Sequence, residues 1–190
     1  MRWVTLYARS RLAPASAAVI LVVVAAAWAA AGRGPGPMDP GTVVLVLAVN
    51  VAAGSIGLGG QDAALERMAA IRWVPRRAVH VLLIGAAAGV GLAALRLVGA
   101  ASVPTGLVVR DAAGLAGLAA LGAALWGAHL AWTLPVGWLA VTVLSPPAPG
   151  TMGEVLHWMT FSPSTTASAG TAWALLVVGT VAYALAGPRR

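Results

Sequence analysis

The sequence has no cysteine and no lysine among its 190 residues. Without cysteine, the chain has no disulfide, no thiolate zinc site and no thiol nucleophile. Without lysine, the Gly-rich phosphate-binding loop that ends in Lys-Ser or Lys-Thr cannot form, so the chain does not hydrolyse ATP by that machinery. His80, His129 and His157 lie too far apart in the sequence to suggest a metal cluster. We therefore expect no enzymatic activity and no cofactor in this chain.

Charge is also scarce, since only 9% of the residues are charged while 60% are apolar. This composition leaves too few polar groups to coat a water-soluble globule. All 12 basic residues are arginines, and they flank apolar runs. That arrangement favours lipid headgroups over nucleic acid as the binding partner of the arginines. The sequence predicts an all-α fold, a polytopic membrane helix bundle.

The apolar runs predict about six transmembrane helices within a single domain of residues 1–190. Residues 107–144 are too long for one crossing, so we expect a break near His129 and a bend at Pro135. Residues 15–31 form the first predicted span, although they also resemble the apolar core of a signal peptide. The other predicted spans are residues 42–58, 78–95, 108–126, 130–144 and 169–186.

Three shorter stretches outside the spans have helical amphipathic patterns. Residues 1–13 interleave arginines with aromatic and aliphatic residues, which predicts an interfacial helix. Residues 61–73 place Leu65, Met68 and Ile71 three apart, which predicts a short helix with one apolar face. Residues 150–160 are bracketed by prolines and predict a re-entrant or interfacial helix on the outer side.

The arginines also predict how the chain is oriented. With six spans, nine arginines fall on one side of the membrane, and only Arg33, Arg96 and Arg110 fall on the other. The positive-inside rule places the nine in the cytoplasm. We therefore expect a multi-pass protein of the cell membrane with the N- and C-termini and residues 61–73 on the cytoplasmic side.

Three polar residues in the predicted spans are candidates for a substrate path or gate. Arg110 and Asp111 begin the span 108–126, and their simpler interpretation is that they snorkel to headgroups at the outer boundary. Asn50 lies in the middle of span 42–58, where an interhelical hydrogen bond is the expected role and a substrate contact the alternative. Glu154 and His157 are too few to make a metal site.

Two further features have more than one interpretation. The helix predicted over residues 61–73 either docks into a groove of a soluble partner or lies on the headgroups. Gly85 and Gly89 in one span, and Gly114 and Gly117 in the next, suit either dimer formation or packing within the chain.

The order of these elements resembles the transmembrane subunit of type-2 ATP-binding-cassette (ABC) exporters, in its short actinobacterial form. In that resemblance, residues 2–14 correspond to the elbow helix and residues 62–78 to the cytoplasmic coupling segment. Residues 110–121 open the fourth span, and the proline-rich outer segment precedes the last one. The similarity covers nearly the whole chain.

The resemblance implies a permease subunit that moves an amphipathic or peptide-like substrate outward, using ATP hydrolysed by a separate ABC ATPase subunit. It also implies that two permease copies, or two related permeases, pair in the bilayer. The residues implied to contact the ATPase subunit are Leu65, Glu66, Arg67, Met68 and Arg72. The alternative is a membrane protein that does not transport, such as an immunity factor or an accessory scaffold.

Overall fold

The computed structural model describes residues 18–19, 21–23, 25–26, 38–59, 73–94, 104–146 and 148–189. The regular secondary structure of these residues is entirely helical, with no strand, which confirms the all-α prediction. The predicted interfacial helix over residues 1–13 lies outside the described residues. The predicted coupling helix over residues 61–73 lies outside them too, except for Trp73. The five candidate contact residues in that helix are therefore not described: Leu65, Glu66, Arg67, Met68 and Arg72.

Four helices are long and apolar enough to cross a membrane, which is consistent with a membrane protein. They are α3 (Pro40–Ser55, continued by the 3-10 helix η1, Ile56–Leu58), α5 (Trp73–Ala93), α6 (Thr105–Trp126) and α9 (Thr166–Ala186). They confirm the predicted helices over residues 42–58, 78–95, 108–126 and 169–186. Pro75 lies two residues after Trp73, which is the first described residue of α5.

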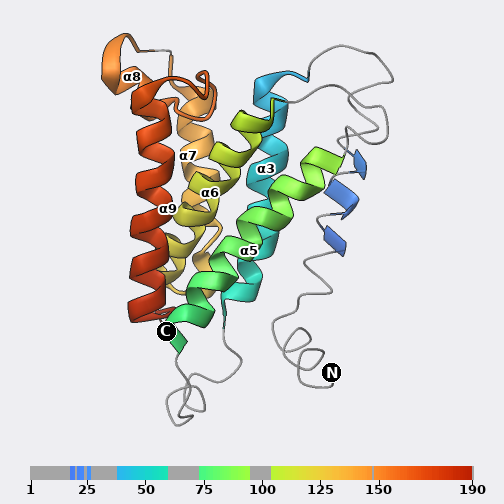
Figure 1. The fold of residues 1–190 in the computed structure, drawn as a ribbon, viewed down its shortest axis with the longest axis vertical. Helices are drawn as coiled ribbons and strands as arrows, with labels where there is room; N and C mark the ends of the chain where they lie inside the picture. The colour runs from blue at the N-terminus through green and yellow to red at the C-terminus, as the bar shows by residue number, and fades with distance from the viewer. Residues whose placement is uncertain are drawn as a thin grey trace.

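The chain reverses after α6, as expected. Gly127 ends the helix with φ at 94°, a value that favours glycine. The 3-10 helix η3 (Ala128–Leu130) and α7 (Thr133–Leu144) follow, and α7 runs back beside α6 (Figure 1). Pro135 lies in the first turn of α7 and marks the helix start instead of a bend. The 12 residues of α7 extend over about 18 Å, less than a hydrocarbon core of about 30 Å.

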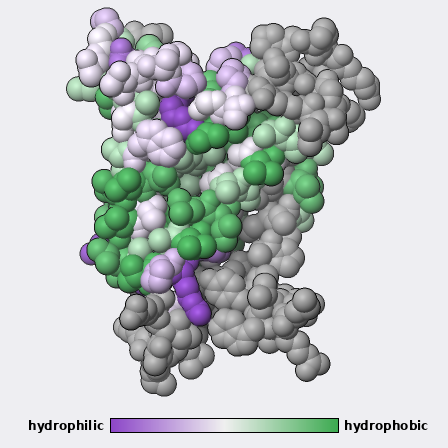
Figure 2. Space-filling model, viewed as in Figure 1, coloured by the Kyte–Doolittle hydropathy of each residue, from purple (hydrophilic) through white to green (hydrophobic). Residues whose placement is uncertain are grey.

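The central helix of the bundle is α6, which contacts α3, α5, α7 and α9. Most of α6 is buried, whereas α5 and α9 keep large exposed apolar faces. Figure 2 shows hydrophobic side chains across the middle of one face and more hydrophilic ones above them. An apolar band between polar ends is the surface that a bilayer requires.

Glycines set the closest helix contacts. A Cβ added to Gly179 of α9 would overlap the backbone carbonyl of Gly117 in α6, and one on Gly117 would overlap the carbonyl of Leu175. A Cβ on Gly85 would lie 3.2 Å from the carbonyl oxygen of Ala112. These small residues therefore serve packing within the chain, one of the two interpretations of the pattern.

The two ends of the bundle differ in composition and are named here by what they contain. At the "arginine end", η1, the start of α5, the end of α6 and residues 187–189 meet (Figure 1). There, the hydroxyl of Tyr183 donates to the carbonyl of Leu58 (2.6 Å), and Nη1 of Arg77 donates to the carbonyl of Ala184 (3.5 Å). At the opposite "α8 end" lie α8 (Gly150–Leu156) and the starts of α3, α6 and α9.

Candidate functional site

The most extensive polar network among the described residues is built around Arg110, near the α8 end of α6. Arg110 and Asp111 are only 3% and 0% exposed. The expectation that they snorkel to headgroups is therefore wrong. The reason is that the loop of residues 157–165, which joins α8 to α9, folds over them and supplies hydrogen-bond acceptors. Nε of Arg110 donates to Oδ1 of Asp111 over 2.8 Å.

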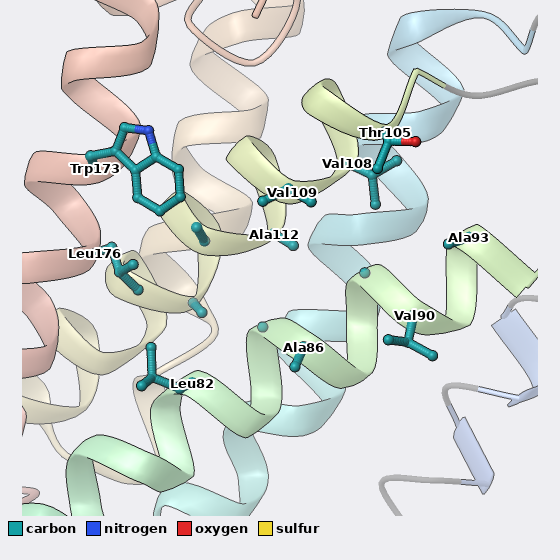
Figure 3. Close-up of a pocket in the computed structure, with 14 residues that line it drawn as sticks. Leu82, Ala86, Val90, Ala93, Thr105, Val108, Val109, Ala112, Trp173 and Leu176 are labelled. Atoms are coloured by element: carbon teal, nitrogen blue, oxygen red, sulfur yellow. The ribbon is translucent and has the colours of Figure 1, made fainter.

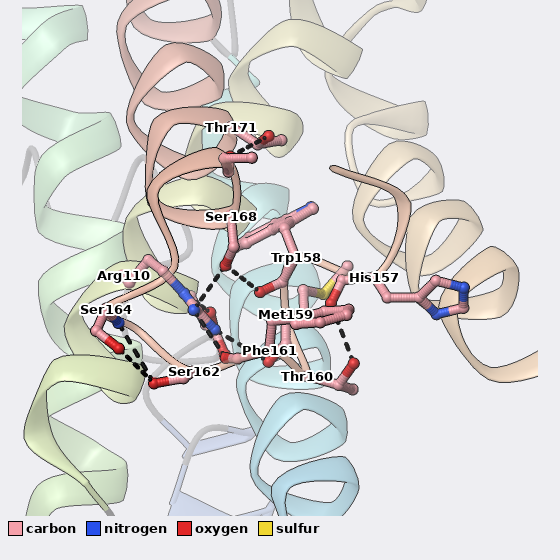
Figure 4. A network of polar contacts seen from close by, with 12 residues as sticks. Arg110, His157, Trp158, Met159, Thr160, Phe161, Ser162, Ser164, Ser168 and Thr171 are labelled. Atoms are coloured by element: carbon pink, nitrogen blue, oxygen red, sulfur yellow. Dashed lines mark hydrogen bonds and ion pairs between the residues drawn. The ribbon is translucent and has the colours of Figure 1, made fainter. Parts of the chain in front are cut away.

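The other guanidinium nitrogens of Arg110 bind that loop (Figure 4). Nη1 donates to the carbonyl of Phe161 (2.9 Å) and to Oγ of Ser168 (2.8 Å). Nη2 donates to the carbonyl of Met159 (3.2 Å), and the guanidinium carbon lies 6.0 Å from the centroid of the Trp158 ring. The planar guanidinium has five N–H donors in a fixed fork, so one side chain can serve several acceptors at once.

Side chains from α7 and α9 donate further hydrogen bonds to the backbone carbonyls of residues 156 and 158. The carbonyl of Leu156 accepts hydrogen bonds from Nε1 of Trp138 (3.0 Å) and Oγ1 of Thr142 (3.3 Å). The carbonyl of Trp158 accepts one from Oγ of Ser168 (2.9 Å). Non-helical backbone at membrane depth is tolerated only where protein or water satisfies its polar groups. Here α6, α7 and α9 each provide donors.

We refer to residues 157–161 as the Trp158 loop. The side chains of Trp158 and Met159 are both fully buried. The ring of Trp158 lies against Gly114, where an added Cβ would overlap the ring. Gly114 is nine residues after Thr105, which is roughly 13 Å along the helix axis. The ring therefore fills the space between the helices well below the α8 end.

Asn50 is buried in α3, and neither its amide nitrogen nor its amide oxygen has a hydrogen-bond partner in the part of the chain that the structure describes. The expected interhelical hydrogen bond of Asn50 is therefore not formed with any described residue. Oδ2 of Asp111 and Nε1 of Trp158 are also buried without a partner. Each unpaired buried polar group costs about 1–3 kcal/mol.

A groove of about 410 Å³ opens on the side of the bundle between α5, α6 and α9 (Figure 3). Small residues form its floor, among them Gly85, Gly89 and Ala116. Leu82 of α5 and Trp173 of α9 project toward it from opposite sides. The lining contains no charged side chain. The groove can therefore accept apolar groups from the bilayer but offers them little directional recognition.

The sequence-based interpretation missed the partners of Arg110, namely Ser168 and the carbonyls of Met159 and Phe161. The sequence contains one indication of these contacts, namely that Arg110 lies in an apolar span, where an arginine requires a polar partner. The nearby proline-rich segment could supply backbone carbonyls that no helix satisfies. The pairing itself joins residues that are 49 to 58 positions apart, and no local pattern indicates it.

Comparison with models of known protein families, with curated proteins and with solved structures finds no match. Gly59, which precedes the predicted coupling helix, and Trp73, the last residue of that helix, are both at the arginine end. The Arg110 network is near the opposite end. The functional interpretation therefore depends on these two ends of the bundle and on the order of the elements.

Proposed function

We propose that this chain is the membrane-spanning permease subunit of an ABC-type exporter, which moves an amphipathic or peptide-like substrate outward with ATP hydrolysed by a separate subunit. The observation that supports the proposal is that the two described ends of the connection between α3 and α5 lie together at the arginine end. The connection between α3 and α5 leaves and re-enters the bundle there, beside the C-terminal tail. A soluble ATPase at this end can reach residues 60–72 and the helices on both sides of them.

The contacts at the arginine end couple the connection to the rest of the bundle. Tyr183 joins α9 to the end of η1, and Arg77 joins the start of α5 to the end of α9. The backbone N–H of Arg189 donates to the carbonyl of Ala123 in α6 (3.1 Å). A displacement of residues 60–72 would therefore act on α3 and α5, and through these bonds on α6 and α9.

The proposed arrangement has six spans, in which residues 15–31 and the segment of η3 and α7 are the first and fifth. Arg76, Arg77 and Arg189 lie at the arginine end, so the positive-inside rule assigns that end to the cytoplasm. The Trp158 loop and α8 then form the re-entrant element on the outer side. Two copies, or two related permeases, pair around the substrate path.

The lack of native cysteine allows a direct test of this orientation. We expect a membrane-impermeant maleimide to label Thr151→Cys in intact cells, because Thr151 is exposed on α8. Ala63→Cys and Arg190→Cys should be labelled only after permeabilisation. The cysteine-free parent is the control for background. Labelling of Ala63→Cys and Arg190→Cys from opposite sides of the membrane would contradict the six-span arrangement.

The partner contact is tested by co-purification with an ABC ATPase encoded beside this chain. We expect Leu65→Asp combined with Met68→Asp to reduce recovery of the ATPase at least tenfold, because both changes put a charge on the apolar face of the predicted helix. Ala63→Asp combined with Ala70→Asp is the matched control. It adds the same charge on the opposite face and should leave the ATPase bound.

Two outcomes would count against this proposal. If the chain and the ATPase purify separately in mild detergent, the proposed exporter subunit is wrong and the non-transporting scaffold or immunity factor replaces it. If both double variants lose the ATPase equally, the contact is not made by the face that carries Leu65 and Met68.

A further inference from the structure

We propose that the Trp158 loop is a releasable plug, which Arg110 latches between α6, α7 and α9, and whose release opens a polar cavity toward the α8 end. Arg110, Asp111 and Ser168 would line that cavity. The inference goes beyond the proposed function, because a plug of this kind needs no ATPase and can be tested on the chain alone.

The loop is attached to the helices around it mainly through side chains. Its backbone N–H groups bond locally, as His157 does to the carbonyl of Gly153 (2.9 Å) and Thr160 to that of His157 (2.9 Å). Among the described residues, the hydrogen bonds from the loop to α6 and α9 come from the side chains of Arg110 and Ser168. The polar attachment of the loop to α6 and α9 therefore consists of a small number of side-chain hydrogen bonds, and the burial of Trp158 and Met159 adds to it.

The side chains of Trp158 and Met159 fill buried space beside α6, where the Trp158 ring lies against Gly114. The guanidinium carbon of Arg110 lies beside them, 6.0 Å from the centroid of the Trp158 ring. When the loop leaves, Arg110 loses two carbonyl acceptors, and the charged pair with Asp111 becomes open. A charged pair in contact with lipid is costly, so the released state requires water in the space that Trp158 vacates.

Exposed hydroxyl side chains lie on the loop and directly after it. Thr160 is exposed on the loop, and Ser162 and Ser164, whose hydroxyls are 2.8 Å apart, are exposed in the residues that follow. This polar surface indicates that the loop borders water. At the start of α8, Gly150 has φ at 76° and no atom within 4 Å of an added Cβ. Glycine in open space permits the backbone rotation that lifting α8 and the loop requires.

The test measures how fast a hydrophilic maleimide labels Met159→Cys in the full chain in membranes. Thr160→Cys, at an exposed position, gives the rate for an open site. We expect Met159→Cys to be labelled slowly in the parent, and at least about tenfold faster when Arg110→Lys is added. Lysine keeps a positive charge beside Asp111 but lacks the fork that binds both loop carbonyls. A tenfold change corresponds to about 1.4 kcal/mol.

Two further variants distinguish specific release of the Trp158 loop from destabilisation of the whole bundle. Ser168→Ala removes the hydroxyl that bonds Arg110 and the carbonyl of Trp158, so it should also speed the labelling, and it replaces Arg110→Lys if that variant does not fold. Tyr183→Phe removes a hydrogen bond at the arginine end and should leave the labelling of Met159→Cys unchanged.

Three results would contradict the proposal that the Trp158 loop is a releasable plug. The first is a parent Met159→Cys that is never labelled while Thr160→Cys reacts fully. The second is a labelling rate that stays at the parent's value in both Arg110→Lys and Ser168→Ala. The third is an equal increase in Tyr183→Phe, which would show that the loop opens only with the whole bundle.

Discussion

Replacing Gly179 by alanine is expected to lower the free energy of unfolding of the bundle by about 2–3 kcal/mol, because the new methyl group would overlap the backbone of α6. The obstacle is the carbonyl of Gly117, which cannot move aside as a flexible side chain does. The two helices would have to separate, and the packing between the most closely joined pair in the bundle would be lost.

The measurement is thermal unfolding of the detergent-solubilised protein, followed by tryptophan fluorescence. Gly170→Ala is the matched control on the same helix, because an added Cβ at Gly170 has no atom within 4 Å. There, the higher helix propensity of alanine should leave stability unchanged or raise it by up to about 1 kcal/mol. Equal melting temperatures for the two variants would show that α6 and α9 do not cross as closely as described.

Replacing Arg110 by leucine is expected to cost about 3–5 kcal/mol, because it leaves the carboxylate of Asp111 buried without its cation. The carbonyls of Met159 and Phe161 would lose their donor in the same step. Replacing both members of the pair, as in Arg110→Leu combined with Asp111→Leu, removes the unpaired charge. We therefore expect the double variant to be more stable than Arg110→Leu alone.

This expectation is checked by a double-mutant cycle with the single variants Arg110→Leu and Asp111→Leu and the double variant, each measured by thermal or denaturant unfolding. The coupling should be well above the ~0.5 kcal/mol scatter of independent sites. Effects that simply add within that scatter would mean that the two side chains do not form a buried pair.

The two proposals concern opposite ends of one bundle. At the arginine end, Tyr183 and Arg77 join the helices on both sides of the segment that would meet the ATPase. Near the α8 end, Arg110 holds the Trp158 loop in place. The helices α6 and α9 extend between both ends and pack tightly at Gly117 and Gly179. The two proposals are tested separately, one by co-purification and one by labelling of Met159→Cys.

Local patterns in the sequence were sufficient for the four long helices and for the reversal at Gly127. A run of apolar residues between breakers is a property of one segment, and its length alone decides whether it can cross a bilayer. The position of Pro135 in the first turn of α7 was less predictable, because a proline starts a helix or bends it according to what surrounds it.

What the sequence by itself determined is that this chain is an all-α bundle with helices suited to a membrane, because hydrophobicity and helix length are local quantities. The tertiary structure decided that Arg110 and Asp111 are buried instead of facing headgroups, and that Asn50 has no hydrogen-bond partner within the described ranges. Burial of a charge depends on what folds over it, and the carbonyl of Phe161 that covers Arg110 lies 51 positions later in the chain. Contacts of that separation arise only when all the helices pack together.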